Sequence, residues 1–261
     1  MREPKATVAV AGRPAAYLEA GHGVPVVLVH GAGGRAAVWA AQLVGLGDVA
    51  RVIAPDLPGH GGIGGKGSAR VSEYAEWLLC FLDAAGLARV VLGGHSMGGA
   101  IAQTVALEQP DRLLGLVLVG TGARLRVLPR ILELLRQAPQ DGRGLIASLS
   151  YSPRTPPEMV VEAERALAET PAPVTLGDYL ACDRFDAMVR LPAVRAPTLV
   201  VVGRDDRLTP PKYSAFLAST IPGARLVEVD DAGHFPQLEQ PTAVNAALRA
   251  FLASLPDANE E

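Results

Sequence analysis

The sequence predicts a doubly wound α/β protein built on a mostly parallel sheet. Two observations lead to this fold class. Short apolar runs lack polar alternation, as in strands that are buried on both faces, and the segments between them show helical periodicity. The apolar runs lie at residues 26–29, 52–54, 90–92, 116–119, 199–202 and 225–229. Helical periodicity is clearest at residues 71–86, 100–109 and 211–220. Because crossovers between parallel strands are right-handed, we expect a site at one edge of the sheet.

Residues 122–194 interrupt this alternation. They contain no clear buried strand and are typical of helices broken by prolines. We expect a turn at residues 138–142, a helix at 158–169 that ends at residues 170–173, and an earlier helix that carries Leu125, Leu128, Leu132 and Leu135. One crossover does not need about 70 residues. We therefore predict one domain, with a core of residues 1–121 and 195–261 and a helical cap of residues 122–194.

Composition and charge exclude several classes of function. The chain has 261 residues and a net charge of −3, which argues against nucleic acid or an anionic membrane as a partner. No apolar run approaches the roughly 18 residues of a membrane span. Residues 1–5 lead into a short alternating segment and not into the apolar core of a signal peptide, so we expect a cytoplasmic protein. Cys80 and Cys182 lack metal-ligand spacing, and we expect Cys80 to be a buried free thiol.

The candidate nucleophile is Ser96, in the segment Gly94-His95-Ser96-Met97-Gly98. This G-x-S-x-G pattern follows a predicted strand and precedes a predicted helix, which is the setting that a nucleophile elbow requires. The turn is sharp, so small residues must flank the serine for the chain to reverse direction. The serine then lies at a helix N-terminus, where the dipole and free N–H groups favour developing negative charge.

A serine hydroxyl is a weak nucleophile and needs a neighbouring base. Among the five histidines we favour His234, because it follows the last predicted strand and lies on the expected edge of the sheet. His22 sits in a glycine-flanked turn and should be solvated. His95 adjoins the serine in a strained turn, so we expect it to pack and not to catalyse.

The base in turn needs a carboxylate that holds its tautomer. The loop after the fifth apolar run contains both Asp205 and Asp206. We favour Asp206, three residues after Gly203, and keep Asp205 as the alternative. We expect Asp205 to cap the loop or to pair with Arg204 or Arg207. The resulting order of nucleophile, acid and histidine along the chain is the order of a nucleophile-elbow fold.

A glycine-rich loop at residues 30–34 follows the first predicted buried strand and lets backbone N–H groups approach a substrate. We expect the N–H of Met97 to be one oxyanion donor and that of Ala32 to be the second, with Gly33 as the alternative. A phosphate site is disfavoured, because the loop lacks the P-loop lysine and the G-x-G-x-x-G spacing. This chemistry requires no metal and no organic cofactor.

Five segments in this order resemble the α/β-hydrolase superfamily, and more narrowly its capped esterase, lactonase and C–C hydrolase branch. They are His30-Gly31, Asp56 to Gly61, Gly94 to Gly99, Gly203 to Asp206 and Gly233-His234. The resemblance covers nearly the whole chain outside residues 122–194. It implies an eight-stranded, mostly parallel sheet with a helical cap inserted after the sixth strand.

These residues predict a serine esterase that cleaves small-molecule carboxylic esters of small to medium acyl chain through an acyl-enzyme on Ser96. Dehalogenases and epoxide hydrolases of this fold use an aspartate nucleophile, so both are disfavoured. A lactonase, C–C bond hydrolase or perhydrolase with the same triad, and a non-catalytic ligand-binding protein, are the alternatives. The cap arginines either contact a carboxylate-bearing substrate or form a solvated helix face; they are Arg124, Arg126, Arg130 and Arg136. The sequence does not specify an oligomeric state.

Overall fold

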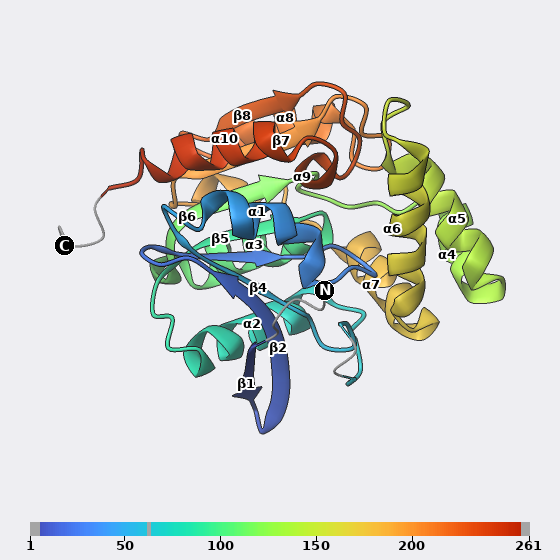
Figure 1. The fold of residues 1–261 in the computed structure, drawn as a ribbon, viewed down its shortest axis with the longest axis horizontal. Coiled ribbons are helices and arrows are strands. Elements are labelled where there is room, and N and C mark those ends of the chain that lie inside the picture. The colour runs from blue at the N-terminus through green and yellow to red at the C-terminus, as the bar shows by residue number, and fades with distance from the viewer. Residues whose placement is uncertain (1–5, 62–63, 257–261) are drawn as a thin grey trace.

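The computed structural model describes residues 6–61 and 64–256; residues 1–5, used above for the expected localisation, lie outside this part. Eight strands form one sheet in the order β1-β2-β4-β3-β5-β6-β7-β8. β2 pairs antiparallel with β1 and β4, and all other neighbours are parallel. The predicted fold class is therefore confirmed (Figure 1). The strands are β1 Ala6–Val10, β2 Arg13–Ala20, β3 Pro25–Val29, β4 Arg51–Pro55, β5 Val90–His95, β6 Leu113–Val119, β7 Thr198–Gly203 and β8 Arg225–Val229.

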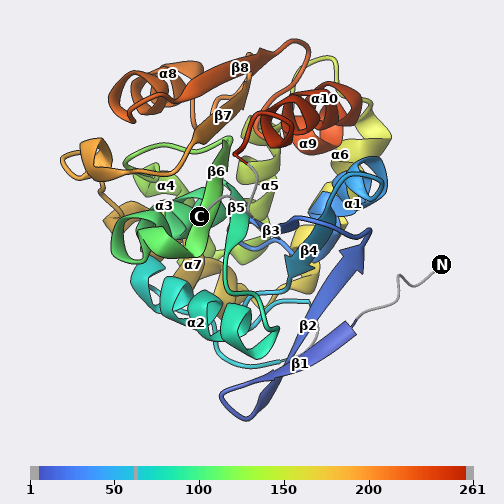
Figure 2. The same ribbon diagram turned by 90° about the vertical axis from the view of Figure 1, so that its left-hand side faces the viewer.

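Helices cover both faces of the sheet (Figure 2). One face packs on α2 (Val71–Ala84), α3 (Met97–Glu108) and α8 (Pro211–Thr220), and the other on α1 (Ala40–Leu46) and α10 (Pro241–Leu252). Successive side chains of β5 enter different cores, because strand side chains alternate between faces. Val90 and Leu92 belong to one core and Val91 to the other. This two-sided burial explains why the central strands are continuous apolar runs in the sequence.

Four helices are inserted between β6 and β7 and lie together at one end of the molecule, to the right of the sheet in Figure 1. We call this group the helical insertion. It consists of α4 (Pro129–Gln137), α5 (Pro139–Ser150), α6 (Pro157–Glu169) and α7 (Ala172–Arg184). The helix expected at residues 158–169 is present as α6.

Two local predictions in the helical insertion are wrong, and one helix is missing from them. The turn expected at residues 138–142 is the first turn of α5, and Leu125 and Leu128 precede α4 instead of belonging to it. The helix end expected at residues 170–173 is correct, since α6 ends at Glu169, but the prolines of that segment also begin α7, which the sequence analysis does not predict. Proline favours the first turn of a helix, where no N–H is needed, so these prolines mark helix starts.

The prediction of a buried Cys80 is also wrong: its side chain is exposed on the outer side of α2, whereas Leu78, Phe81 and Leu82 of that helix are fully buried. Cys182 of α7 is the buried cysteine. The apolar run around Cys80 extends round the whole helix, so periodicity did not separate its two faces.

Within residues 6–61 and 64–256, no helix combines the length and apolar character that crossing a membrane requires.

Candidate active site

Ser96 occupies the turn between β5 and α3, with φ 53° and ψ −115°. This left-handed backbone is strained for a residue with a side chain and costs about 1–3 kcal/mol. The flanking glycines make the turn possible. A Cβ on Gly94 would lie 2.1 Å from the backbone of Gly98, and one on Gly98 would lie 2.3 Å from the Val29 carbonyl oxygen. The strand–turn–helix setting expected for Ser96 is therefore present.

His234 and Asp206 meet at the same edge of the sheet. The two atoms His234 Nδ1 and Asp206 Oδ2 are 2.9 Å apart, and both residues are almost fully buried. Asp206 Oδ1 accepts the N–H groups of Leu208 (2.9 Å) and Thr209 (2.8 Å), while the Thr209 hydroxyl donates to Oδ2 at 2.7 Å. Burial alone would raise the pKa of Asp206, but attraction to His234 and these hydrogen bonds outweigh it and lower that pKa. Asp206 is thus a carboxylate at neutral pH.

The alternative acid, Asp205, faces away from this pair. Its Oδ2 accepts the Ser152 hydroxyl at 2.5 Å, and its N–H donates to the Ala232 carbonyl. The expected pairing of Asp205 with an arginine is wrong: Arg204 lies 3.1 Å from Asp230, and Arg207 donates to the Ser148 carbonyl. Asp205 therefore ties the loop after β7 to the helical insertion.

Ser96 and His234 share one small cavity of about 20 Å³, which Ala32 also lines. The N–H groups of Ala32 and Met97 make no hydrogen bond to any residue that the structure describes. In contrast, the Gly33 N–H donates to Asp178 Oδ2 at 2.8 Å. The structure thus brings Ser96, His234 and Ala32 together. The N–H of Gly33, the alternative donor, is already bound to Asp178.

The loop that carries His234 is held by a carboxylate that the sequence analysis missed. Glu239 Oε1 accepts the N–H groups of Gly233 (2.9 Å) and Phe235 (3.1 Å), the two neighbours of His234. Its Oε2 accepts the Ser152 N–H at 2.9 Å. One signal was available, because Glu239 lies only five positions after the histidine and a short helix, α9 (Pro236–Glu239), brings it back to that loop.

Two other histidines were considered as the base, His95 next to the serine and the distant His22. His95 is fully buried, and its Nε2 donates to the carbonyl of His234 at 2.8 Å. Burial, reinforced by the proximity of His234, lowers the pKa of His95 well below its ordinary value, so the ring is neutral. His22 is exposed. The His95 ring also lines the small cavity with Ser96, but, in contrast to His234, it makes no hydrogen bond to a carboxylate among the described residues.

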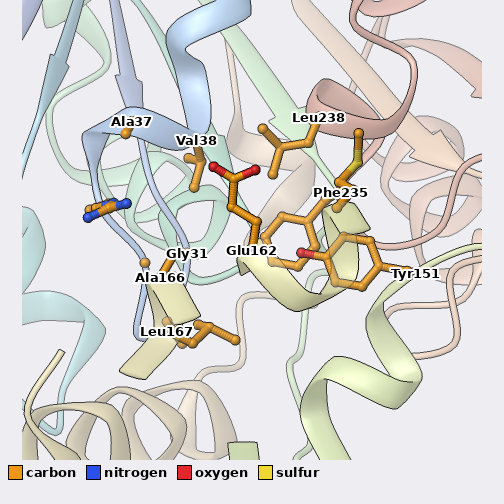
Figure 3. A pocket seen from close by; sticks show the side chains of 13 residues that line it. Gly31, Ala37, Val38, Tyr151, Glu162, Ala166, Leu167, Phe235 and Leu238 are labelled. Atoms are coloured by element: carbon orange, nitrogen blue, oxygen red, sulfur yellow. The ribbon is translucent and has the colours of Figure 1, made fainter. Parts of the chain in front are cut away.

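A larger pocket of about 290 Å³ adjoins the small cavity and shares Ala32, Leu167 and Phe235 with it. Its other apolar lining includes Val38 and Leu238. Figure 3 shows Glu162 reaching from α6 into this pocket. The second charged residue of the lining, Arg35, is ion-paired with Glu169.

The four arginines considered as substrate contacts lie elsewhere. Arg124 is 3.6 Å from Asp186, and Arg130 is 2.8 Å from Glu133. Arg126 donates to the Asp183 carbonyl at 3.0 Å. None of the four, Arg136 included, lines either cavity at the site.

In the described part of the chain, no group of three or more His, Cys, Asp or Glu side chains is arranged to hold a metal ion.

Comparisons with known proteins agree with this architecture. Residues 24–241 match the model of the α/β hydrolase fold family. A protein of Azorhizobium caulinodans that carries the provisional name carbamate hydrolase RutD is 34% identical over 90% of this chain and 93% of its own. A solved thermophilic esterase from Thermogutta terrifontis is 32% identical, with a TM-score of 0.87 over 96% of this chain and 98% of its own. An enol-lactonase from Burkholderia xenovorans is 25% identical, with a TM-score of 0.88 over 96% of this chain and 100% of its own. This chain belongs to the α/β hydrolase fold family.

Proposed function

We propose that the protein is a serine hydrolase that cleaves carboxylic esters of small to medium acyl chain. The observation that carries this proposal is the shared cavity of Ser96 and His234, behind which Asp206 binds the other ring nitrogen of the histidine at 2.9 Å. The similarity to an esterase at 32% identity supports the same reaction class. The family membership supports hydrolysis in general, and the ester bond is the narrower part of the proposal.

The mechanism has two acyl-transfer steps. His234 Nδ1–H donates to Asp206, which leaves Nε2 as the base that takes the Ser96 proton while Oγ attacks the carbonyl carbon. The oxyanion accepts the N–H groups of Ala32 and Met97. The engagement of Gly33 by Asp178 supports Ala32 as the second donor. The leaving alcohol takes the proton from His234, and water activated by the same ring then cleaves the acyl-enzyme.

The substrate group that enters the larger pocket is apolar and uncharged. Most of its lining is aliphatic or aromatic, and a volume of about 290 Å³ suits a medium chain and not a large one. Glu162 reaches into this pocket as a carboxylate, which disfavours a second carboxylate there. Because α6 supplies part of the lining, we propose that residues 122–194 act as the cap that sets substrate size.

A lactonase is the second candidate, because the fold and 25% of the residues match an enol-lactonase. A C–C bond hydrolase or a perhydrolase would use the same three residues. A protein that only binds ligands is less well supported, since binding alone does not require both Asp206 and His234 beside a serine.

The test is turnover by purified protein of p-nitrophenyl acetate, butyrate and octanoate beside a panel of lactones. We expect butyrate to be the best ester, with lactones at least about tenfold slower. Ser96→Ala should lose about 10³-fold or more of kcat and keep its Tm, whereas Ser72→Ala, at an exposed serine of α2, serves as the matched control. Wild-type turnover in Ser96→Ala would overturn the proposal, and faster cleavage of lactones would replace the ester assignment.

A further inference from the structure

A second buried carboxylate lies close to the site but outside the reacting groups. Asp178 of α7 is fully buried, and both of its oxygens are occupied. Oδ2 accepts the Gly33 N–H at 2.8 Å and lies 2.8 Å from His60 Nε2. Oδ1 accepts the Tyr74 hydroxyl at 2.6 Å. These partners come from the loop after β3, the loop after β4 and helix α2, so one residue of the helical insertion joins three segments of the core.

The surroundings of the histidine in this cluster favour its protonated form. His60 Nδ1 donates to the Pro58 carbonyl at 3.1 Å and Nε2 donates to Asp178, so both ring nitrogens carry hydrogen. Burial alone would lower the pKa of His60, but the hydrogen bond and the negative charge of Asp178 outweigh it and raise that pKa. Protonated His60 and Asp178 form a buried ion pair. Removing one member of such a pair leaves the other charge without compensation.

The Gly33 backbone is held from both sides by the helical insertion. Asp178 binds its N–H, and the Thr170 hydroxyl donates to its carbonyl at 2.9 Å. Gly33 has φ +65°, a left-handed conformation that glycine adopts without strain. Its N–H shares a peptide plane with the Ala32 carbonyl, so the bond to Asp178 also fixes the ψ angle of Ala32.

We propose that Asp178 is a positioning residue that holds the oxyanion loop, and through it the Ala32 N–H, in the geometry that stabilises the transition state. The inference rests on the proposed function. Asp178 touches neither substrate nor the reacting atoms; it acts through the Gly33 peptide. Because Asp178 belongs to α7, the oxyanion loop is correctly placed only while the helical insertion is docked on the core.

The test uses Asp178→Asn in the full chain, measured with p-nitrophenyl butyrate and with an alkyl trifluoromethyl ketone. The ketone forms a tetrahedral adduct with Ser96 whose oxyanion needs the same N–H donors. Loss of one oxyanion donor costs about 10²–10³ in kcat, and a displaced donor should cost about 10–100-fold. We expect kcat and the affinity for the ketone to fall by the same factor, while KM changes by less than about threefold.

The matched control is Asp183→Asn on the same helix, where the carboxylate accepts the Val127 N–H at 3.1 Å and does not reach the oxyanion loop. It should keep kcat and ketone affinity near wild type. Asp178→Asn with wild-type values for both, a loss of kcat without a loss of ketone affinity, or an equal loss in Asp183→Asn would each overturn the proposal.

A second variant guards against failure of Asp178→Asn to fold. Tyr74→Phe removes one of the donors that orient Asp178, so the carboxylate that accepts the Gly33 N–H is held less firmly. It should lower kcat and ketone affinity together by a few fold, and unchanged values would overturn the positioning role. If the wild type neither cleaves the ester nor binds the ketone, the proposed function fails first, which is distinct from an active enzyme that is indifferent to Asp178.

Discussion

Two buried aspartate–histidine pairs lie on the same side of this molecule, and they differ in what surrounds the histidine. Asp206 binds His234 at 2.9 Å and Asp178 binds His60 at 2.8 Å. The second nitrogen of His60 is taken by the Pro58 carbonyl. Within the described residues, the second nitrogen of His234 has no such partner, and the ring lines a cavity with Ser96.

This difference shows that burial and a carboxylate do not by themselves make a histidine a base. A histidine whose two nitrogens both donate is held as a cation and has no lone pair to offer. A histidine with one nitrogen bound to a carboxylate keeps the other free to accept a proton. The first arrangement suits a structural anchor, and the second suits proton transfer.

Asparagine substitutions at the two aspartates should separate these roles most strongly. Asp206→Asn should lower kcat by about 10³–10⁴-fold, because the asparagine amide stabilises the wrong tautomer of His234. Asp178→Asn should lower it by only about 10–100-fold. Steady-state kinetics on p-nitrophenyl butyrate measure both. Asp205→Asn is the matched control for the first and should stay within a few fold of wild type, and equal losses at Asp205 and Asp206 would contradict the assignment of the acid.

Glu239 holds the loop that carries His234, much as Asp178 holds the oxyanion loop. Both carboxylate oxygens of Glu239 accept backbone N–H groups, so in Glu239→Gln the amide N–H₂ must displace either the two bonds beside His234 or the bond from Ser152. We expect kcat to fall about tenfold with a modest decrease in Tm. Glu228→Gln, at an exposed position of β8, controls for the loss of charge. A fully active Glu239→Gln would show that this loop does not need the anchor.

The pH dependence of the free energy of unfolding tests the pair of Asp178 and His60. Because folding raises the pKa of His60, its contribution to stability is complete below the unfolded pKa of about 6.5 and is lost as the pH rises through the folded pKa. Urea unfolding should therefore show His60→Gln destabilised most near pH 6, with the difference from wild type shrinking towards alkaline pH. His22→Gln, at an exposed histidine, should show no such trend. A difference that grows with pH would contradict the ion pair.

The smallest effect is expected at the exposed carboxylate in the pocket. Glu162→Gln should raise kcat/KM for mono-p-nitrophenyl adipate relative to p-nitrophenyl hexanoate by about threefold, because exposed charges contribute little in water. Added salt should reduce the effect. Glu164→Gln on the same helix does not line the pocket and is the control. An unchanged ratio would show that Glu162 does not select substrate charge.

The sequence predicts the candidate site residues best where the constraint on residue type comes from neighbouring positions in the chain. The glycines around Ser96 follow from a turn whose backbone atoms approach within 2.1–2.3 Å of any added Cβ, and such a constraint is visible in five consecutive residues. His234 and Asp206 lie in loops directly after strands, and parallel strands bring those loops to one edge of the sheet. The placement of these residues therefore needed no knowledge of the tertiary structure beyond the fold class.

The tertiary structure alone decided which groups support the site. Gly33 and Asp178 are 145 positions apart in the chain, and no local pattern connects them. Asp178 lies on α7, a helix that the sequence does not predict because prolines stand at its start. Helical periodicity likewise does not predict that Cys80 is exposed. The sequence determined the fold class and the candidate reacting residues, because strand burial and a strained turn restrict residue type locally. Contacts between the helical insertion and the core depend on how two distant surfaces pack, so only the folded chain revealed them.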